Sequence, residues 1–433
     1  MTTTEFDVIP MTHQDGLNIS DHLNRMANIL SGKIDWEDGI FGFIEHGDIL
    51  DPATRIEYVG VNKDFHPIQI DKTTGEYNLN EWVSYPFLVE NKPWMVNADG
   101  TGDYQLNESD YTKKLNGSAS DVANTSYAGA GAFSWARKIY KHEHSIGNDR
   151  YVYFSFTKKP GYYANGFKVG DEERPGAWIP MFYGTAVDGK MKSFAAGYPD
   201  GGKTTAQQWT AISAIGDNAR FFGGALVETL IDLMIMFAKT TDLQSAYGTG
   251  NMSGYDATDE QHHGTLENAV VGGGQFYGTS TGTALNKVFH SLVLATQNVY
   301  LRDPYEIIVN GHVKVSKYYE YDLSGAAYLD TGVRIPNDGS AASDGWKYPS
   351  VYKAVPEWGG VPIVPGSGST ALGGCDGVYE SANQATITAV SLRFGYCSHG
   401  ATGGPRARVW YGTAGGAYWY CGCAPVLFHP VSA

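Results

Sequence analysis

The pattern of hydrophobic and polar positions along the chain predicts many short strands and a few helices. Apolar residues recur at helical spacing in residues 19–30 and 225–238, and Thr204 or Thr205 is expected to cap a helix ending near Ala214. In residues 285–299 the spacing fits a helix or a strand. Strand-like alternation or short apolar runs occur at 40–45, 55–61, 151–157, 177–184, 305–325 and 385–394.

The helix expected at 225–238 has an apolar stripe typical of a helix that faces a protein core. Four apolar residues recur along it at helical spacing: Leu226, Leu230, Met234 and Phe237. Asp232 lies off this stripe, so we expect it on the solvated face of the helix.

The length of 433 residues favours two domains. Residues 99–126 are rich in Asn, Asp, Ser and Gly, which makes this stretch the best candidate for a boundary. We therefore expect a smaller mixed or β-rich domain over 1–125 and a larger domain over 126–433. From residue 322 onward prolines and a Gly/Ser-rich run predict long loops, which in ordered proteins often carry function.

Charge and composition narrow the classes of partner. The net charge of −15 and the lack of Lys/Arg clusters argue against a nucleic-acid-binding face. The most apolar run, 225–237, is too short to cross a bilayer and contains Glu228 and Asp232, so no membrane insertion is expected. Residues 1–10 lack the pattern of a secretory signal. The 54 glycines and 29 tyrosines indicate many turns and a surface rich in contact groups.

Candidate metal ligands do not form a recognisable set. The cysteines at 375, 397, 421 and 423 fit unpaired thiols better than a zinc site, because Cys421-x-Cys423 lacks the usual two-to-four-residue gap. His142-x-His144 and His262-His263 lie in polar stretches and are expected on the surface. No catalytic metal or other cofactor is predicted, although loop carboxylates and carbonyls near Asp376 could hold a structural calcium ion.

Residues 197–204 read GYPDGGKT and fit the phosphate-loop pattern G-x-x-x-x-G-K-T ahead of a helix. Against a nucleotide site, the preceding residues 191–196 make a poor buried parallel strand, with Lys192 among them. The alternation of strands and helices that a nucleotide-binding fold needs is also missing. A phosphate-loop nucleotide-binding protein therefore remains only a lesser alternative.

The C-terminal segment has an unusual composition. Residues 391–433 contain no Lys, Glu, Gln or Met, and Gly, Tyr, Trp, Ser, His and Thr are frequent. Surfaces that recognise ligands favour rigid aromatic residues together with small polar ones. From composition alone, a ligand-contacting surface and a Gly/Tyr-rich hairpin that packs its own rings are equally good readings.

The spacing of fixed-looking positions in this segment carries a resemblance to a known family. The positions are Ser391-Leu392-Arg393-Phe394-Gly395, Gly403-Gly404-Pro405-Arg406-Ala407, Trp410, Ala417, Trp419, Gly422 and Ala424-Pro425-Val426-Leu427-Phe428. They resemble the variable segment of proteins diversified by retroelements, which include tropism-determining proteins of phages. In that family asparagine codons of a template are randomised at their adenines, which can yield Tyr, Ser, His, Gly, Thr, Val or Cys but not Lys, Glu, Gln, Met or Trp. Upstream residues 91–94, 110–114, 119–124 and 179–184 also resemble tail-associated proteins of phages.

The resemblance implies an α+β fold with a C-type-lectin-like C-terminal domain of the formylglycine-generating-enzyme type, in which residues 391–428 form the variable segment. Arg393, Trp410 and Trp419 would hold a buried scaffold, whereas Cys421 and Cys423 depart from the family pattern. The diversified, ligand-contacting positions would be Tyr396, Ser398, His399, Thr402, Val409, Tyr411, Gly412, Gly415, Gly416, Tyr418 and Tyr420.

We therefore expect a receptor-binding protein of a phage tail, made in the host cytoplasm, that binds a host-cell surface protein or glycan and catalyses no reaction. Residues 1–125 would attach it to other tail proteins or drive oligomerisation, and a trimer would suit an adhesin because linked weak sites gain avidity. Two alternatives stay open: a structural tail or capsid component, and an enzyme. An enzyme related to formylglycine-generating enzymes would need paired reactive cysteines, for which Cys421 and Cys423 are the nearby candidates.

Overall fold

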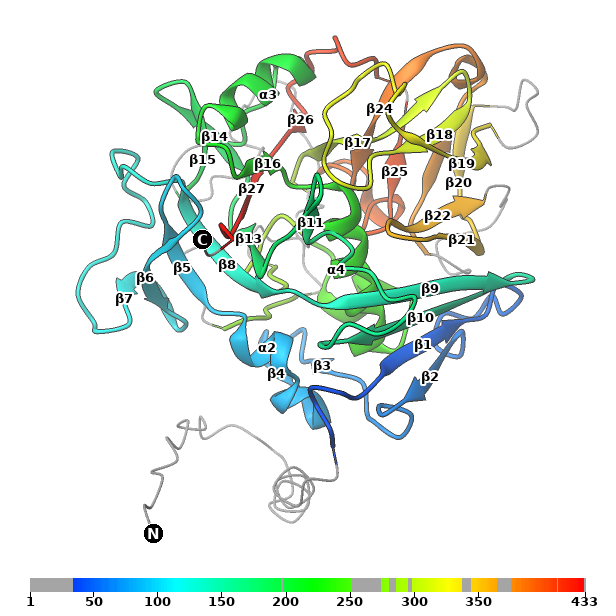
Figure 1. The fold of residues 1–433 in the computed structure, drawn as a ribbon, viewed down its shortest axis with the longest axis horizontal. Coiled ribbons are helices and arrows are strands. Elements are labelled where there is room, and N and C mark those ends of the chain that lie inside the picture. Colours follow the sequence, from blue (N-terminus) through cyan, green and yellow to red (C-terminus); the bar gives the residue numbers. More distant parts are fainter. Residues whose placement is uncertain are drawn as a thin grey trace. The chain divides into compact units, whose positions relative to one another are not determined.

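The computed structural model describes residues 34–195, 198–250, 274–279, 286–294, 298–336, 344–363, 375–410 and 412–431. The chain divides into two compact units, Met1–Asp35 and Trp36–Ala433, and every element described below belongs to the second (Figure 1). Its fold is mixed and rich in strands. The helix expected at 19–30 and the His262-His263 pair lie outside the described residues, as do 1–10 and the Gly/Ser-rich run 366–374.

A nine-stranded sheet joins strands from the whole length of this unit. Its central strand β8 pairs with β13 on one side and with β5 on the other, and β27 from the C-terminus lies between β13 and β16. The order is β16 (Ala219–Phe221), β27 (Pro425–Phe428), β13 (Gly176–Pro180), β8 (Gly131–Arg137), β5 (Pro93–Val96), β6 (Gly102–Asn107) and β7 (Asp110–Lys114), with the hairpin β14 (Gly184–Val187) and β15 (Lys190–Ser193) joined through β15 to β8.

An eight-stranded sheet carries most of the C-terminal segment. Its long central strand β17 pairs antiparallel with β18 and β24, and parallel with β26. The order is β19 (Leu329–Arg334), β18 (His312–Val315), β17 (Tyr300–Val309), β24 (Thr388–Arg393), β25 (Arg408–Val409), β23 (Val378–Glu380) and β20 (Gly345–Lys347), with β26 (Cys421–Gly422) beside β17.

A four-stranded antiparallel sheet and three short ribbons complete the strands. The four-stranded sheet has the order β2 (Ile56–Gly60), β1 (Phe41–Glu45), β10 (Asp149–Ser155) and β9 (Tyr140–Ile146). The ribbons are β3 (Gln69–Ile70) with β4 (Tyr77–Asn78), β11 (Lys168–Val169) with β12 (Glu172–Glu173), and β21 (Val351–Val355) with β22 (Gly359–Ile363). The strands predicted at 40–45, 55–61, 151–157 and 385–394 are thus confirmed within two or three residues at their ends.

The helices are few, and most are short. They are α2 (Pro86–Glu90), α3 (Thr205–Ser213), α4 (Gly224–Ala238) and α5 (Leu243–Tyr247), with 3-10 turns η1 (Asn80–Ser84), η4 (Ala382–Ala385) and η5 (Gly400–Thr402). Thr204 caps α3 as predicted, because its side chain accepts a hydrogen bond from Gln207 N while the Gln207 side chain accepts one from Thr204 N. The described parts of 285–299 form turns and bridges rather than a helix.

Helix α4 lies among the sheets and is buried on all sides (Figure 1). The apolar stripe is therefore in the core, but the position expected for Asp232 is wrong. Asp232 is only 2% exposed and accepts hydrogen bonds from Lys141 and Arg150 of the four-stranded sheet, at 2.7 Å and 2.6 Å. Glu228, one helical turn earlier, contacts arginines of the eight-stranded sheet. The two carboxylates thus connect one helix to two sheets.

The polar stretch 99–126, expected to separate two domains, lies inside the second unit. Its strands β6 and β7 extend the sheet that also contains the C-terminal strand β27. Polar side chains hold the turns: Asp99 accepts from Thr101 N at 2.9 Å, and Asn107 accepts from Ser109 N at 2.8 Å. The polar composition here reflects the turns of a hairpin, and the division of the chain falls after Asp35 instead.

Candidate functional site

The C-terminal segment threads through two sheets before it ends. Strand β24 pairs with β25, which places Leu392 opposite Val409 and Arg393 opposite Arg408. After a loop, β26 lies parallel to β17, with Cys421 opposite Tyr300, and β27 then enters the nine-stranded sheet. The described residues between β24 and β26 form two loops, 394–407 and 412–420, and both loops begin and end at strands of the eight-stranded sheet.

Arg393 and Arg408 anchor these strands through buried ion pairs. Arg393 contacts Asp303 at 3.1 Å and Glu306 at 2.9 Å, both from β17, and also pairs with Glu228 of α4. Arg408 contacts Glu228 at 2.6 Å and Glu306 at 3.2 Å. Burial alone would raise the pKa of Glu228, but Arg408 and Arg393 hold it below its usual range. Such a network fixes one arrangement, because removing a single partner leaves an uncompensated buried charge.

Arg406 anchors the first loop. Its guanidinium pairs with Glu45 of β1 at 2.8 Å and covers the ring of Tyr352, 3.4 Å from the ring centroid. Its backbone N–H donates to Asp376 at 2.6 Å. The arginines at 393, 406 and 408 are thus all buried, as the resemblance led us to expect for Arg393.

Asp376, near which a structural calcium ion was considered, has a buried side chain. Burial raises its pKa to about 8, even though the Arg406 N–H lowers it, so the carboxyl is largely neutral at neutral pH. Within the described ranges, no three His, Cys, Asp or Glu side chains are grouped so that they could hold a metal ion.

Four of the positions expected to contact ligand lie in one continuous group of rings. Tyr396 contacts His399 with ring centroids 4.3 Å apart and stacks on Tyr420 at 5.2 Å, and Tyr420 stacks on Tyr418 at 5.3 Å. Neighbouring rings extend the group, which we call the aromatic array: Tyr300, Trp346, Tyr379, Tyr396, His399, Tyr418, Trp419 and Tyr420. Tyr418 is 39% exposed, and Tyr396, His399 and Tyr420 are half-buried. The rings of the array are therefore partly exposed to solvent, while their inner sides pack closely against one another.

The base of the array contains a residue that was expected at the surface. Val409 is fully buried and packs with Tyr300, Leu392 and Cys421, against which Tyr396 and Tyr420 lie. Val409 therefore packs against the buried side of the array and is not exposed at its surface. Trp410 is buried as expected, whereas Trp419 is only half-buried, because it lies at the edge of the array beside Tyr396 and Tyr420.

The small residues among the expected positions are divided between the two loops. Ser398 is exposed, and the half-buried Thr402 donates from its hydroxyl to the His399 carbonyl at 2.6 Å, which fixes the η5 turn. In the second loop Gly415 is exposed, Gly416 is half-buried and Gly412 is buried near the Tyr418 ring. Tyr411 lies outside the described residues.

Three members of the array come from outside the C-terminal segment and were not predicted. Trp346 pairs with Tyr379 across β20 and β23, and Tyr379 lies opposite Val409 across β23 and β25. With Tyr300 and His399, these two rings line a shallow hollow of about 410 Å³. The loop-rich sequence around them gave no signal for this, because only the strand register brings them together.

The imidazole of His399 is uncharged at neutral pH. Burial lowers the pKa of His399 to about 4, and its Nε2 lies 3.2 Å from the Tyr300 hydroxyl. A ligand would therefore meet planar rings, a neutral imidazole and hydroxyl groups. Such groups bind by shape, stacking and hydrogen bonding.

The backbone of the phosphate-loop motif packs against the backbone of the second loop at Tyr418 and Trp419. A Cβ on Gly201 would lie 1.9 Å from the Trp419 carbonyl oxygen, so only glycine allows the two backbones to approach so closely. Gly202 N donates to the Tyr418 carbonyl at 2.9 Å, and Lys203 pairs with Asp200 at 2.6 Å. The preceding strand β15 forms an antiparallel hairpin with β14 rather than the central parallel strand of a nucleotide-binding sheet.

Arg302 joins the phosphate-loop motif to the second loop. Its guanidinium donates to the Thr205 hydroxyl at 2.6 Å and to the carbonyls of Lys203 and Gly416 at 3.2 Å and 3.0 Å. The start of α3 and the Gly416 turn are therefore held by one buried side chain.

The four cysteines all lie among the described residues, are buried and form no disulfide bond. Burial raises the pKa of Cys421 and of Cys375 to about 12, so both stay protonated at neutral pH. The four thiols are thus not joined in disulfides, as predicted. No helix in the described part of the chain is long and apolar enough to cross a membrane.

Comparisons with family models and curated proteins assign no family to the chain. No protein-family model matches the chain, and no significant match is found among curated proteins. A function can therefore be assigned only from the aromatic array, its buried framework and the resemblance of residues 391–428.

Proposed function

We propose that this chain is a receptor-binding adhesin of a phage tail, in which a C-type-lectin-like domain of the formylglycine-generating-enzyme type displays a diversified ligand-binding surface. One observation supports this most strongly. Tyr396, His399, Tyr418 and Tyr420, all from positions expected to vary, gather in one partly exposed array. Arg393 and Arg406, the arginines expected to stay fixed, are buried in ion pairs. This division fits a protein whose exposed residues vary while its buried residues stay the same.

The proposed mechanism is binding alone. Tyrosine rings give large contact areas at a low cost in side-chain entropy, and the small residues Ser398 and Gly415 leave room for a partner to approach. The partner would be a protein or glycan on the host-cell surface. Other tail proteins would hold the chain through its N-terminal region, and a trimer would raise the avidity of weak single sites.

Binding of purified protein to host cells tests this proposal. Tyr418→Ala and Tyr420→Ala should each weaken binding by about tenfold or more, since buried aromatic anchors commonly contribute 2 kcal/mol or more, roughly thirtyfold. Tyr198→Ala is a matched control, because Tyr198 is 41% exposed and lies outside the array, against 39% for Tyr418. Equal binding by all three variants would contradict the proposal.

A swap of residues 396–420 separates an adhesin from a structural tail component. In an adhesin the swap should change which cells are bound while virions still assemble. Loss of virion assembly with unchanged binding by the purified protein would favour the structural component.

The genome offers an independent test of diversification. A near-copy of the DNA encoding residues 391–428, differing almost only where the copy has adenine, should lie near the gene together with a reverse transcriptase. Without such a repeat or reverse transcriptase, active diversification is ruled out, although the adhesin itself would stand.

A further inference from the structure

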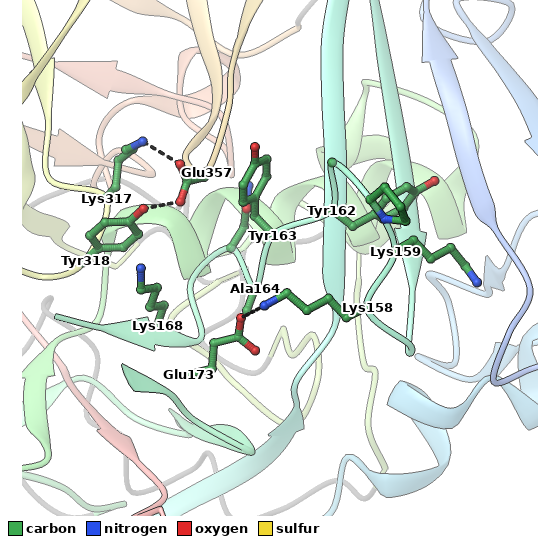
Figure 2. Close-up of a pocket in the computed structure, with 13 residues that line it drawn as sticks. Lys158, Lys159, Tyr162, Tyr163, Ala164, Lys168, Glu173, Lys317, Tyr318 and Glu357 are labelled. Atoms are coloured by element: carbon green, nitrogen blue, oxygen red, sulfur yellow. Dashed lines mark hydrogen bonds and ion pairs between the residues drawn. The ribbon is translucent and has the colours of Figure 1, made fainter. Parts of the chain in front are cut away.

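A second pocket lies outside the C-terminal segment, around the β11–β12 ribbon and the loop that precedes it (Figure 2). It encloses about 360 Å³, which is within the size range of small-molecule sites. Its walls come from residues 158–168, from Glu173, and from the separate segments that contain Tyr318 and Glu357. Nothing in the aromatic array contributes to it, so it is a separate candidate site.

The pocket concentrates positive charge on an acidic protein. Four lysines line it, at 158, 159, 168 and 317, against two glutamates, at 173 and 357. The whole chain has a net charge of −15. A local excess of ammonium groups in such a chain selects for an anionic ligand and raises its local concentration.

Four of the six charged side chains form two ion pairs, and Lys159 lies 4.0 Å from Asp38, which is not part of the pocket lining. Lys158 contacts Glu173 at 2.7 Å and Lys317 contacts Glu357 at 2.7 Å. Lys168 lies between the two pairs (Figure 2) and over the ring of Tyr318, 4.0 Å from its centroid. No ion pair of Lys168 is found among the described residues. Lys168 is thus placed to meet an anion without breaking an existing pair.

A buried amide in the pocket wall also points to a ligand. Asn165 is only 3% exposed and lines the pocket, yet neither its side-chain nitrogen nor its oxygen has a hydrogen-bond partner in the described structure. An unpaired buried donor or acceptor costs about 1–3 kcal/mol. Both atoms are closed to solvent, so a rotation of the side chain toward the pocket would let a hydroxylated ligand accept from the nitrogen and donate to the oxygen.

We propose that this pocket binds an acidic sugar unit, a single sugar ring that carries a carboxylate or phosphate group. Lys168 meets the anion, with Lys158 and Lys317 beside it. The Asn165 amide, Glu173 and Glu357 hydrogen-bond to ring hydroxyls, and the exposed ring of Tyr163 offers a face for stacking. The site belongs to residues outside 391–428, so it would stay the same while the aromatic array varies.

Isothermal titration of the full chain with four probes tests the proposal: glucuronate, glucose 6-phosphate, glucose and inorganic phosphate. Saturable binding of either acidic sugar, at least about tenfold tighter than glucose and inorganic phosphate, is the expected result. The tighter of the two acidic sugars identifies the anion. Glucose or inorganic phosphate binding as tightly as both acidic sugars would overturn the proposal, and so would a lack of saturable binding by all four.

Variants assign the binding to this pocket. Lys168→Gln and Lys317→Gln should each weaken acidic-sugar binding by about tenfold, since a charge-assisted hydrogen bond is lost. Lys63→Gln is the control, because the Lys63 side chain is 69% exposed, pairs with its neighbour Asp64 and lies outside the pocket lining. Equal affinity of all three variants would place the sugar elsewhere and contradict the assignment.

A variant of the aromatic array tests the pocket independently of the proposed adhesin function. Tyr418→Ala should leave acidic-sugar binding within about twofold of the unmodified chain, since Tyr418 lies in the aromatic array. Loss of cell binding in Tyr418→Ala with intact sugar binding supports both proposals. Loss of sugar binding in that variant would overturn the separate pocket alone.

Discussion

The ring of Tyr396 stacks on the ring of Tyr420 with centroids 5.2 Å apart and planes 23° apart. The first residue belongs to the loop after β24 and the second to the loop before β26, so the stack joins the two loops of the C-terminal segment. Tyr396 also contacts Tyr300 at 5.2 Å and His399 at 4.3 Å. It is therefore the point at which the separate parts of the array meet.

Replacing Tyr396 should loosen the array. In Tyr396→Ala several ring contacts are lost, each contributing about 0.5–1.5 kcal/mol, so the free energy of unfolding should fall by about 2 kcal/mol. Tyr396→Phe keeps the ring and should stay within about 0.5 kcal/mol of the unmodified chain. Urea unfolding followed by tryptophan fluorescence measures both. Equal stability of the two variants would show that the ring contacts do not hold the loops.

Replacing Arg393 should destabilise the framework beneath the array. Arg393→Met leaves Asp303 and Glu306 as buried carboxylates with less compensating charge, which should lower the free energy of unfolding by about 3–5 kcal/mol. Lys63→Met is the control, because its exposed pair with Asp64 should contribute less than about 1 kcal/mol. Urea unfolding of the two variants gives the comparison, and a similar small loss in both would contradict the role assigned to Arg393.

Local sequence signals predicted the parts of this fold that local physics determines. The Thr204 cap, helix α4 and strand β24 follow from side-chain type and periodicity, and all are present. The place of Asp232 was not predictable, because its partners Lys141 and Arg150 lie in a different sheet. A carboxylate on a helix usually faces solvent unless it forms an ion pair with a cation from another part of the chain. The sequence alone does not show which distant residues form such a pair.

The candidate site shows the same limit. Tyr396, His399, Tyr418 and Tyr420 come from one segment with an unusual composition, so the sequence could single them out. Their neighbours Trp346 and Tyr379 join them only through the register of β20, β23 and β25. Val409 has the residue type expected of a varied position, yet strand pairing with Leu392 turns it inward.

Gly201 should tolerate no side chain, in contrast to an exposed glycine of the array loop. In Gly201→Ala the added Cβ would lie 1.9 Å from the Trp419 carbonyl oxygen, so one of the two loops must move. Gly415→Ala is the matched control, since the nearest atom to its added Cβ is 3.9 Å away. We expect Gly201→Ala to lower stability by about 1–3 kcal/mol and to alter the fluorescence of Trp419. Thermal unfolding and emission spectra check this, and a Gly201→Ala variant identical to Gly415→Ala would contradict it.

His399 should make the stability of the chain depend on pH in the mildly acidic range. Its pKa is lowered from 6.5 to about 4 in the folded protein by burial. Above pH 6.5 the imidazole is neutral in both states, so its contribution is fully present. As the pH falls from 6.5 to 4, the unfolded chain takes up a proton that the folded chain does not, and stability is lost.

The His399→Gln variant isolates this contribution. Because glutamine does not titrate, the variant should lose less stability than the unmodified chain between pH 7 and pH 4, by at most about 3 kcal/mol. Urea unfolding at several pH values in this range gives the difference, and other titrating groups cancel because both proteins contain them. Tyr418→Ala serves as the control, since it removes an array ring and leaves His399 in place. Parallel pH profiles for all three proteins would mean that His399 is as well hydrated in the folded chain as in the unfolded one.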